Sequence, residues 1–371
     1  MKIAYDYQTF TLQAYGGISR YFVRLAEELN QRGQEIRVFA PYYCNQLLSS
    51  LPASLVEGKK ISSKDLPKPL TAGLLVANQL IAKIGISRWR PDLVHETYYA
   101  MRRSGSKKCP VVLTVYDMIH EKFSQHFHKV DPTSFLKRQA VKRADHIICI
   151  SESTKRDLIE FFPFVENKVS VVHLGFSAYA PEIKEAVIDK PYLLYVGSRN
   201  GHKNFTNLLQ SLANSEKLRS NFDLIAFGGG TFSAAEQDAI AHLKFNSAQV
   251  RQVSGNDNLL ALYYKKASAF VYPSYYEGFG LPPLEAMAQN CAVVSSNTSS
   301  MPEVIGEAGE YFDPHSTEQI AQAIERVVFS HSRKEELVRL GKKRLELFTW
   351  PTCATQTQQI YSQVINQFER H

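Results

Sequence analysis

The chain has 371 residues, of which 44% are hydrophobic and 21% are charged, a composition typical of a globular protein. No window reaches the roughly 18 uninterrupted apolar residues of a membrane-spanning helix, and the five scattered cysteines form no Cys-x-x-Cys pair. These features exclude a transmembrane helix, a disulfide framework and a cysteine zinc site. The length suggests two domains of ordinary size, each able to bury its own core.

The net charge of +7 is unevenly distributed along the chain. Residues 1–180 hold 25 lysines and arginines against 16 acids, whereas residues 181–371 hold 18 against 20. A basic first half is compatible with nucleic acid, an anionic membrane surface or an anionic acceptor. The first apolar run is too short for a signal peptide, so we expect a cytoplasmic protein.

The first 40 residues predict a βαβ unit. Residues 2–7 favour a strand, residues 18–29 keep apolar side chains at helical spacing up to a C-cap at Gly33, and residues 35–40 favour a second strand. A polar and aromatic loop is expected between the first strand and the pair Gly16 and Gly17. This pair is not the Gly-x-Gly-x-x-Gly dinucleotide fingerprint, and by itself it indicates only a tight turn.

Residues 45–90 have the least distinct pattern in the chain. Residues 70–84 predict a helix of mixed apolarity, and basic side chains flank it on both sides: Lys59, Lys60, Lys64, Lys68, Arg88 and Arg90. Two interpretations are open. The segment is either a core helix with solvated basic ends, or a basic and apolar surface that contacts a membrane or a lipid-linked acceptor.

Alternating strands and helices continue through the first half. Strands are predicted at residues 92–97, 111–117, 146–151 and 169–174, a helix at 133–143, and an N-cap at Ser151. The strand at 111–117 ends in a polar segment that contains Asp117 and His120. A histidine directly after a strand is more often structural than catalytic, so the role of His120 stays open. Residues 177–190 contain charges and Pro181 without apolar periodicity, and they predict a linker.

The second half has the same alternation. Strands are predicted at residues 191–197, 223–227, 250–255, 269–273 and 292–296, and helices at 316–330, at 333–347 and at the end of the chain. Arg199 and Lys203 flank the turn after the first of these strands. Two cations at such a turn can neutralise a diphosphate, although they would also be unremarkable as surface charges.

One stretch, residues 273–288, organises the interpretation of the chain. It joins the strand ending at Pro273 to a helix over residues 281–289 through a loop with two glycines, at the edge of an α/β sheet where ligands bind. Backbone N–H groups and the helix dipole favour an anion there. Glu277 and Glu285 flank this site, and carboxylates accept hydrogen bonds from hydroxyls. A phosphate together with hydroxyls indicates a sugar nucleotide, although both acids are also compatible with ordinary surface and helix-dipole roles.

The stretch from Tyr272 to Met287 resembles the signature of the family 4 retaining glycosyltransferases, in which Gly-Phe-Gly-Leu-Pro lies between two glutamates. The resemblance covers most of the chain, most strongly residues 191–350 and least residues 45–90. It implies an α/β chain with the GT-B fold, that is, two facing Rossmann-like domains with a cleft between them. The expected domains are an acceptor-side domain at residues 1–180, on which the tail 351–371 packs, and a nucleotide-sugar-binding domain at 181–350.

The resemblance also implies roles for the residues of the signature. Glu277 is expected to hold hydroxyls of the donor sugar and Glu285 the ribose of the nucleotide. The loop amides are expected to line the sugar and the diphosphate, and this loop consists of Gly278, Phe279, Gly280 and Leu281.

Outside the signature, the resemblance extends to both halves of the chain. Arg199 and Lys203 match a cationic pair that binds the donor diphosphate, and the pair Gly16 and Gly17 matches glycines that lie against that diphosphate from the first domain. Many members have His-Asp at positions 116 and 117. This chain keeps the acid, Asp117, but has a tyrosine before it, and His120 is a candidate to occupy the space of the missing histidine.

The sequence contains no Asp-x-Asp, the acid pair that holds a divalent metal in the other large glycosyltransferase fold. Arg199, Lys203, the loop amides and helix dipoles are expected to stabilise the leaving diphosphate instead, so we predict metal-independent transfer with no cofactor. The family is thought to retain configuration by same-face attack, with the donor phosphate taking the acceptor's proton.

These observations predict a retaining hexosyltransferase that uses GDP-mannose or a UDP-sugar. The predicted acceptor is a glycan or a polyprenyl-diphosphate-linked glycan in the synthesis of O-antigen or another cell-surface polysaccharide, with the enzyme peripheral on the inner face of the membrane. Two alternatives remain: a sugar-nucleotide epimerase of the same superfold, which lacks the two-glutamate signature, and a nucleic-acid-binding protein. No nucleic-acid-binding motif or run of basic residues supports the second alternative.

Overall fold

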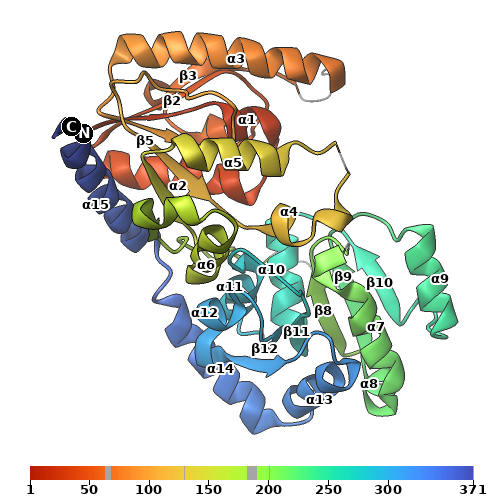
Figure 1. The fold of residues 1–371 in the computed structure, drawn as a ribbon. Helices are drawn as coiled ribbons and strands as arrows, with labels where there is room; N and C mark the ends of the chain where they lie inside the picture. Colours follow the sequence, from red (N-terminus) through yellow and green to blue (C-terminus); the bar gives the residue numbers. More distant parts are fainter. Residues whose placement is uncertain (63–67, 129, 182–189, 200, 371) are drawn as a thin grey trace. The chain divides into compact units, whose positions relative to one another are not determined.

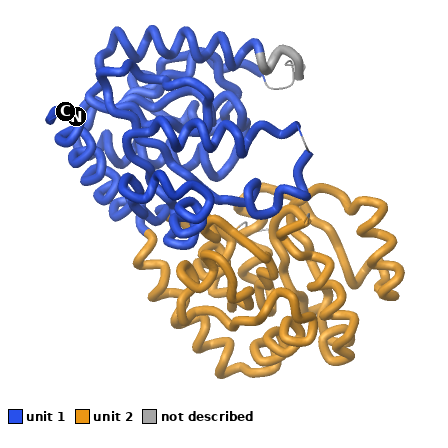
Figure 2. Tube along the Cα trace, in the orientation of Figure 1, with its two compact units in different colours: residues 1–175, 349–371 blue, residues 176–348 orange. Residues whose placement is uncertain are grey.

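The computed structural model describes the whole chain except residues 63–67, 129, 182–189, 200 and 371. It forms two compact units, one of residues 1–175 together with 349–371 and one of residues 176–348 (Figure 2). We call them unit 1 and unit 2. The division lies within five residues of the boundaries at 180 and 350 that were expected from the sequence.

Unit 1 is built on a seven-stranded sheet in which all pairs are parallel, with the order β3-β2-β1-β4-β5-β6-β7 (Figure 1). Most of its central strand residues are apolar and buried, as expected when helices cover both faces of a parallel sheet. The strands are β1 (Lys2–Tyr5), β2 (Glu35–Tyr43), β3 (Val56–Lys60), β4 (Leu93–Glu96), β5 (Val111–Val115), β6 (His146–Cys149) and β7 (Val169–Val171).

The helices of unit 1 connect these strands, and the final helix of the chain returns to this unit. They are α1 (Gln8–Leu12), α2 (Gly17–Gln31), α3 (Lys68–Trp89), α4 (Ile119–Lys122), α5 (Thr133–Arg143), α6 (Glu152–Phe161) and α15 (Trp350–Glu369), with short 3-10 turns at Leu47–Ser50, Ala53–Leu55, Ser124–His126 and Pro163–Lys168. Arg32, at the end of α2, donates to Thr355 and to the carbonyl of Pro351 in α15. Tyr361 of α15 lies 2.6 Å from the buried His95 of β4.

Unit 2 is built on a six-stranded parallel sheet with the order β10-β9-β8-β11-β12-β13. Strand order reverses between β8 and β11, which are neighbours in the sheet but are separated in the sequence by β9 and β10. The strands are β8 (Tyr192–Val196), β9 (Asp223–Phe227), β10 (Val250–Val253), β11 (Ala269–Tyr272), β12 (Val293–Ser296) and β13 (Gly309–Phe312).

The helices of unit 2 pack on this sheet around one apolar core, to which Leu193, Leu224 and Val271 contribute from three neighbouring strands. They are α7 (Phe205–Asn214), α8 (Glu216–Asn221), α9 (Ala234–His242), α10 (Asp257–Lys266), α11 (Leu281–Ala288), α12 (Met301–Ile305), α13 (Thr317–Val328) and α14 (His331–Leu345), with 3-10 turns η6 (Gly201–Lys203) and η7 (Gly306–Ala308).

The predicted fold class, two Rossmann-like domains of α/β type, is confirmed by these two parallel sheets. Ser151 caps α6 as predicted, because its hydroxyl accepts a hydrogen bond from the backbone N–H of Thr154. One local expectation is wrong: the segment before Gly16 contains the short helix α1 instead of a continuous loop. Its residues 8–11 are buried, and Thr9 and Thr11 hydrogen-bond to neighbouring elements.

Other differences concern the lengths of elements and the described part of the chain. Helix α3 is longer than the predicted helix at 70–84, and β5 ends at Val115, two residues before the predicted end. Lys64 and residues 182–189 of the predicted linker lie outside the described residues.

Candidate functional site

The residues predicted to bind a donor gather at one edge of the sheet of unit 2. Parallel strands all end at the same edge, and the loops that follow β8 and β11 leave it side by side, at the point where strand order reverses. In open α/β sheets, ligands bind at this point, outside the carboxyl ends of the strands. Lys203 belongs to the loop after β8, and Glu277 belongs to the loop after β11.

The two loops are joined by an ion pair between these residues. The ammonium nitrogen of Lys203 lies 2.7 Å from Oε1 of Glu277, and the same oxygen accepts a hydrogen bond of 2.6 Å from the hydroxyl of Ser274. The Lys203 side chain is 19% exposed and that of Glu277 is 11% exposed. The pair is therefore held in a fixed position, yet solvent still reaches it.

The electrostatic environment keeps Glu277 ionised. Burial by itself would raise the pKa of this carboxyl, but the charge of Lys203 and the hydrogen bonds from Lys203 and Ser274 outweigh burial, so the pKa is lower than its ordinary value. At neutral pH Glu277 is consequently a carboxylate, an acceptor without protons. It can accept hydrogen bonds from the hydroxyl groups of a ligand.

The loop that carries Glu277 is fixed by two serines at the start of α12. Ser299 donates to the carbonyl oxygen of Glu277 at 2.6 Å, and the Ser300 hydroxyl lies 2.6 Å from the carbonyl oxygen of Phe279. In a trans peptide, the carbonyl and the following N–H point in opposite directions. The N–H groups of Gly278 and Gly280 are therefore directed away from these serines. Such an orientation suits the binding of an anion by backbone amides.

Gly280 has a backbone conformation that few other residues adopt. Its φ is +122°, and it directly precedes Leu281, the first residue of α11, where Pro282 and Pro283 occupy the first turn. The turn allows the chain to pass from the loop into a helix whose amino end lies at the same edge of the sheet. The predicted order of strand, glycine loop and helix is thus present.

Glu285 lies one turn into α11, at a small pocket within unit 2. Its Oε2 accepts a hydrogen bond of 3.2 Å from the hydroxyl of Tyr264 in α10. The pocket is lined by both polar and apolar side chains: Phe176, Tyr179, Asp257, Leu260, Ala261, Tyr264, Glu285 and Gln289. The pocket is too small in this structure to enclose a nucleoside, and Glu285 and Asp257 give it carboxylates that can accept hydrogen bonds from hydroxyls at its mouth.

Arg199, the second cation predicted to bind the diphosphate, has a different environment. Its side chain is only 2% exposed, and its guanidinium lies 2.7 Å from Glu236. The remaining N–H groups donate to backbone carbonyls of the loop after β9, at Gly228, Gly229, Gly230 and Thr231. These three glycines all have positive φ values, so the loop needs the conformational freedom of glycine. Arg199 stabilises that loop, whereas Lys203 presents its charge at the edge.

In unit 1, Gly16 and Gly17 begin helix α2. Gly16 precedes the helix with an extended φ of 174°, and Gly17 is its first residue. A Cβ added to Gly17 would meet nothing within 4 Å, and one added to Gly16 would meet only the flexible side chain of Gln13. The backbone conformation therefore does not require glycine at either position. The absence of side chains leaves open space at the start of the helix.

Asp117 and His120 occupy the loop and the short helix α4 that follow β5. Oδ1 of Asp117 accepts a hydrogen bond of 3.0 Å from the N–H of Ile119, which places the carboxyl at the start of α4. His120 stacks on Phe127 with ring centroids 3.9 Å apart, and its Nε2 lies 3.7 Å from Asp131. Both groups have a local structural role, and both remain partly exposed.

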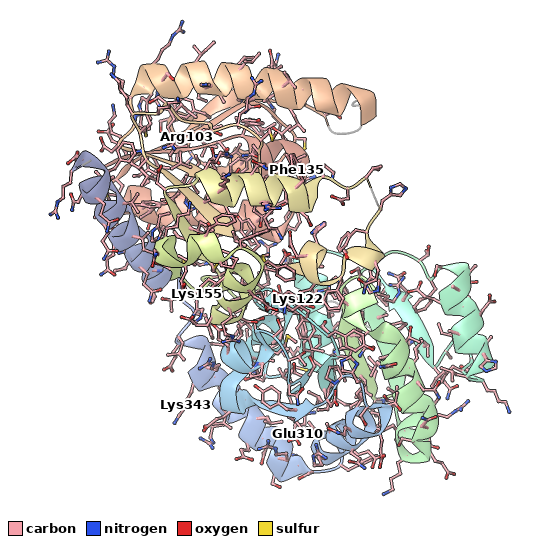
Figure 3. All side chains as sticks on the ribbon, in the orientation of Figure 1. Arg103, Lys122, Phe135, Lys155, Glu310 and Lys343 are labelled. Atoms are coloured by element: carbon pink, nitrogen blue, oxygen red, sulfur yellow. The ribbon has the colours of Figure 1, made fainter. Side chains whose placement is uncertain are left out.

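A buried lysine holds this segment in place. Lys137 of α5 is 1% exposed, and its ammonium lies 2.6 Å from Glu121 and 2.9 Å from the carbonyl oxygen of Asp117. Lys122, which is labelled in Figure 3, is the last residue of α4. Its ammonium nitrogen lies 2.6 Å from Asp157 of α6. The segment from Asp117 to Lys122 is therefore tied to two helices of unit 1.

Comparisons with known protein families match both units. The model described as "Glycosyl transferases group 1" matches residues 180–344, and the model "Glycosyltransferase Family 4" matches residues 15–178. The chain belongs to the family 4 glycosyltransferases. Together the two matches include nearly all of the donor-side and acceptor-side residues described above, which confirms the resemblance found in the sequence.

Individual relatives of this glycosyltransferase act in polysaccharide and sugar synthesis. O-antigen chain mannosyltransferase B of Escherichia coli is 29% identical over 253 residues, which cover 63% of this chain and 66% of that protein, so the match spans just under two thirds of the relative. Sucrose-phosphate synthase from Thermosynechococcus elongatus has the same fold, with a TM-score of 0.77 at 19% identity over 99% of this chain and 100% of the other.

A second similar structure contains UDP-glucose. Anabaena Alr3699/HepE in complex with UDP-glucose superposes with a TM-score of 0.73 at 16% identity, covering 98% of this chain and 100% of the other. At these identities the structural likenesses show the fold alone.

The structure adds residues of this glycosyltransferase that the sequence did not single out. Ser274, Ser299 and Ser300 fix the signature loop, and their position directly after β11 and before α12 was the available signal. Lys137 was also missed. It lies three and four residues before the buried Ala140 and Val141, so helical spacing places it on the core-facing side of α5.

Two further observations concern ligands and membranes. Among the residues that the structure describes, no group of three or more histidine, cysteine, aspartate or glutamate side chains is arranged to hold a metal ion. Within the same part of the chain, no helix has both the length and the apolarity needed to cross a bilayer.

Proposed function

We propose that this glycosyltransferase moves a hexose from a nucleotide sugar to a glycan or to a polyprenyl-diphosphate-linked acceptor in the synthesis of a cell-surface polysaccharide. The observation that carries the proposal is the accessible pair of Lys203 and Glu277, 2.7 Å apart at the strand-order reversal. The ammonium group of Lys203 can bind the diphosphate of a nucleotide sugar, and the carboxylate of Glu277 can accept hydrogen bonds from the hydroxyls of its sugar. The Escherichia coli relative favours mannose as the sugar, and the Anabaena complex favours a UDP-sugar.

Each group at the edge has a part in donor binding under this proposal. Lys203 contacts the diphosphate, Glu277 accepts hydrogen bonds from sugar hydroxyls, and Glu285 accepts them from the ribose. The backbone amides of residues 278–281 line the sugar and the diphosphate. When a donor binds, Lys203 exchanges part of its interaction with Glu277 for the phosphate oxygens, so the pair must be accessible rather than sealed.

The proposed reaction retains the anomeric configuration and uses no metal or cofactor. The bond between the anomeric carbon and the phosphate oxygen breaks, and the acceptor oxygen forms its bond on the same face. The acceptor proton passes to the leaving nucleoside diphosphate. Lys203 and the loop amides stabilise the charge that develops on that leaving group, an effect of about 3–4 kcal/mol for a well-placed donor.

The roles of the residues in unit 1 rest on the family resemblance. Gly17 would let a diphosphate approach the start of α2 closely, because nothing lies within 4 Å of where its Cβ would be, whereas at Gly16 the flexible Gln13 side chain would have to move aside. Asp117 and His120 are proposed to contact the reacting sugars, in addition to their local structural roles. Arg199 is proposed to act through the glycine loop that it stabilises, rather than by direct contact with the diphosphate.

The test is a reaction panel of UDP-, GDP- and ADP-sugars with glycan acceptors, followed by NMR of the products. The proposal expects one nucleotide sugar to be consumed in an acceptor-dependent way and the new linkage to have the anomeric configuration of the donor. An inverted product would contradict the retaining mechanism. Epimerised donor without transfer would identify an epimerase instead. Loss of activity with a chelator and recovery with magnesium would contradict the metal-independent reaction.

A further inference from the structure

Helix α3 has an outward face that is apolar although it is exposed. Val76, Leu80 and Ile84 are 60%, 57% and 53% exposed. With 3.6 residues per turn, positions four apart lie almost above one another, so the three side chains form one line along the helix. Ile81, beside this line, is 45% exposed.

The opposite face of α3 is already covered by the sheet. Ala82 and Ile86 are buried, and Phe39 of β2 packs against Trp89 with ring centroids 5.7 Å apart. The fully buried Asn78 accepts a hydrogen bond from the N–H of Tyr42 and donates one to its carbonyl oxygen. These contacts fix the rotation of the helix, so the line of Val76, Leu80 and Ile84 cannot turn into the core. Figure 1 shows α3 along the outer side of the sheet of unit 1.

Basic residues flank the aliphatic line, and acids are absent from the helix. The sequence of α3 (Lys68–Trp89) contains no aspartate or glutamate. Lys83 and Arg88 are exposed, and together with Arg90 they line a shallow groove whose apolar walls are Leu80 and Ile84. Lys59 of β3 lines a second groove beside Ile81, and the acid in that groove, Glu57, lies 3.6 Å from Arg37. The cations thus lie on the same side of the helix as the exposed aliphatic groups.

This combination differs from both common kinds of surface helix. A solvated helix usually carries charges of both signs on its outer face, and a helix that is apolar all round is usually buried. Here helix α3 itself combines exposed aliphatic groups, which favour removal from water, with cations and no acid. An anionic bilayer surface satisfies both requirements, because the aliphatic groups enter the acyl boundary while lysine and arginine contact the lipid phosphates.

We propose that the outward face of α3, defined by Val76, Leu80, Lys83, Ile84 and Arg88, docks unit 1 on an anionic phospholipid membrane. The contact lies in the plane of the interface and does not cross the bilayer. The biological purpose of this docking rests on the proposed transferase function, because docking would bring the enzyme to a lipid-linked acceptor. Membrane binding and sugar transfer are measured separately, so the failure of one is distinguishable from the failure of the other.

The experiment is co-sedimentation of the full chain with two kinds of vesicle. One is phosphatidylcholine alone, and in the other about one lipid in three is phosphatidylglycerol. Three variants are compared with the native chain: V76S/L80S/I84S, K83S/R88S, and V130S/L347S. The last is a matched control, because Val130 and Leu347 are also exposed aliphatic residues but lie outside α3. Circular dichroism and transfer to a soluble acceptor report whether each variant remains folded and active.

The proposal expects the native chain and the control to bind anionic vesicles equally. The aliphatic triple variant should partition at least about tenfold less, and the basic double variant about thirtyfold less at low salt, since each cation near an anionic surface strengthens binding by about fivefold. Equal partitioning of all four proteins would overturn the proposal. So would a native dimer that the triple variant converts to a monomer without any change in lipid binding, because the face would then bind a second copy of the chain.

Discussion

The two units each contain a lysine and glutamate pair beside the carboxyl end of a strand, but the two pairs differ in exposure. In unit 2, Lys203 and Glu277 are 2.7 Å apart and 19% and 11% exposed. In unit 1, Lys137 and Glu121 are 2.6 Å apart and only 1% and 5% exposed. The distances are nearly equal, so distance does not separate a binding pair from a structural one. The exposure of the lysine does, since a phosphate must reach the ammonium group in order to exchange with it, and this group is 19% exposed in Lys203 but 1% exposed in Lys137.

The largest effect is expected when the buried pair is broken. Replacing Lys137 with methionine leaves Glu121 as an uncompensated buried charge, and removal of one partner of such a pair destabilises a protein by about 3–5 kcal/mol. Chemical denaturation of Lys137→Met should show this loss. The double variant Lys137→Met with Glu121→Leu should recover most of it, since no isolated charge remains. A stable single variant would mean that the unit 1 pair is not structurally important.

A smaller effect is expected when the accessible pair is broken, and it concerns mainly the rate of sugar transfer instead of stability. Lys203→Ala should lower the rate of sugar transfer by about 10²–10³-fold, as for loss of one preorganised charge donor. Its denaturation midpoint should fall less than that of Lys137→Met, because Lys203 and Glu277 are 19% and 11% exposed and water can partly solvate the remaining carboxylate. If Lys203→Ala unfolded the protein while leaving the rate per folded molecule unchanged, the distinction between the two pairs would be wrong.

The Glu285→Gln variant is expected to weaken donor binding about tenfold, because a hydrogen bond to a charged group contributes about 1.5–3 kcal/mol and glutamine replaces only part of it. The ribose that Glu285 is proposed to hold is not part of the bond that breaks, so the transfer rate at saturating donor should change little. Calorimetric titration with the nucleotide sugar and steady-state kinetics measure the two quantities. Unchanged affinity would exclude Glu285 from the donor site.

The smallest expected effect is a change in pH dependence. Although burial would raise the pKa of Glu277, Lys203 and Ser274 hold it below its ordinary value, so the contribution of the ionised group to stability is present above the unfolded pKa. That contribution is lost as the pH falls through the folded pKa. In Lys203→Met, burial would dominate and the pKa of Glu277 should rise. The acid limb of the pH–rate profile should therefore move to higher pH, and an unshifted limb would show that Glu277 is not coupled to Lys203.

The sequence predicted unit 2 better than unit 1 for a physical reason. The loop with Glu277 and Gly280 is a continuous local pattern of strand, glycine turn and helix, and local patterns can be recognised from spacing. Arg199 shows the limit: its position beside a turn was evident, but its burial against the glycines at 228–230 depends on a loop about 30 residues away. The pair of Lys137 and Glu121 likewise depends on tertiary packing of α5 on the segment after β5.

Helix α3 is another element whose surroundings could not be predicted from its local sequence. Its sequence is apolar at most positions, and this pattern is compatible with either a buried or an exposed helix. The contacts of Asn78 with Tyr42, together with the burial of Ala82 and Ile86, establish which face lies inward. The exposed aliphatic line of Val76, Leu80 and Ile84 follows from that placement and not from composition.

The central claim is that the accessible pair of unit 2 binds the donor, with Lys203 on its diphosphate, and calorimetry with nucleoside diphosphates tests that contact most directly. UDP, GDP and ADP would be titrated into the native chain, Lys203→Ala, and the double variant Lys137→Met with Glu121→Leu. We predict that one nucleotide binds the native chain and the double variant equally, and binds Lys203→Ala at least about tenfold more weakly. Equal affinity for all three proteins, or no binding of any nucleotide to the native chain, would contradict it.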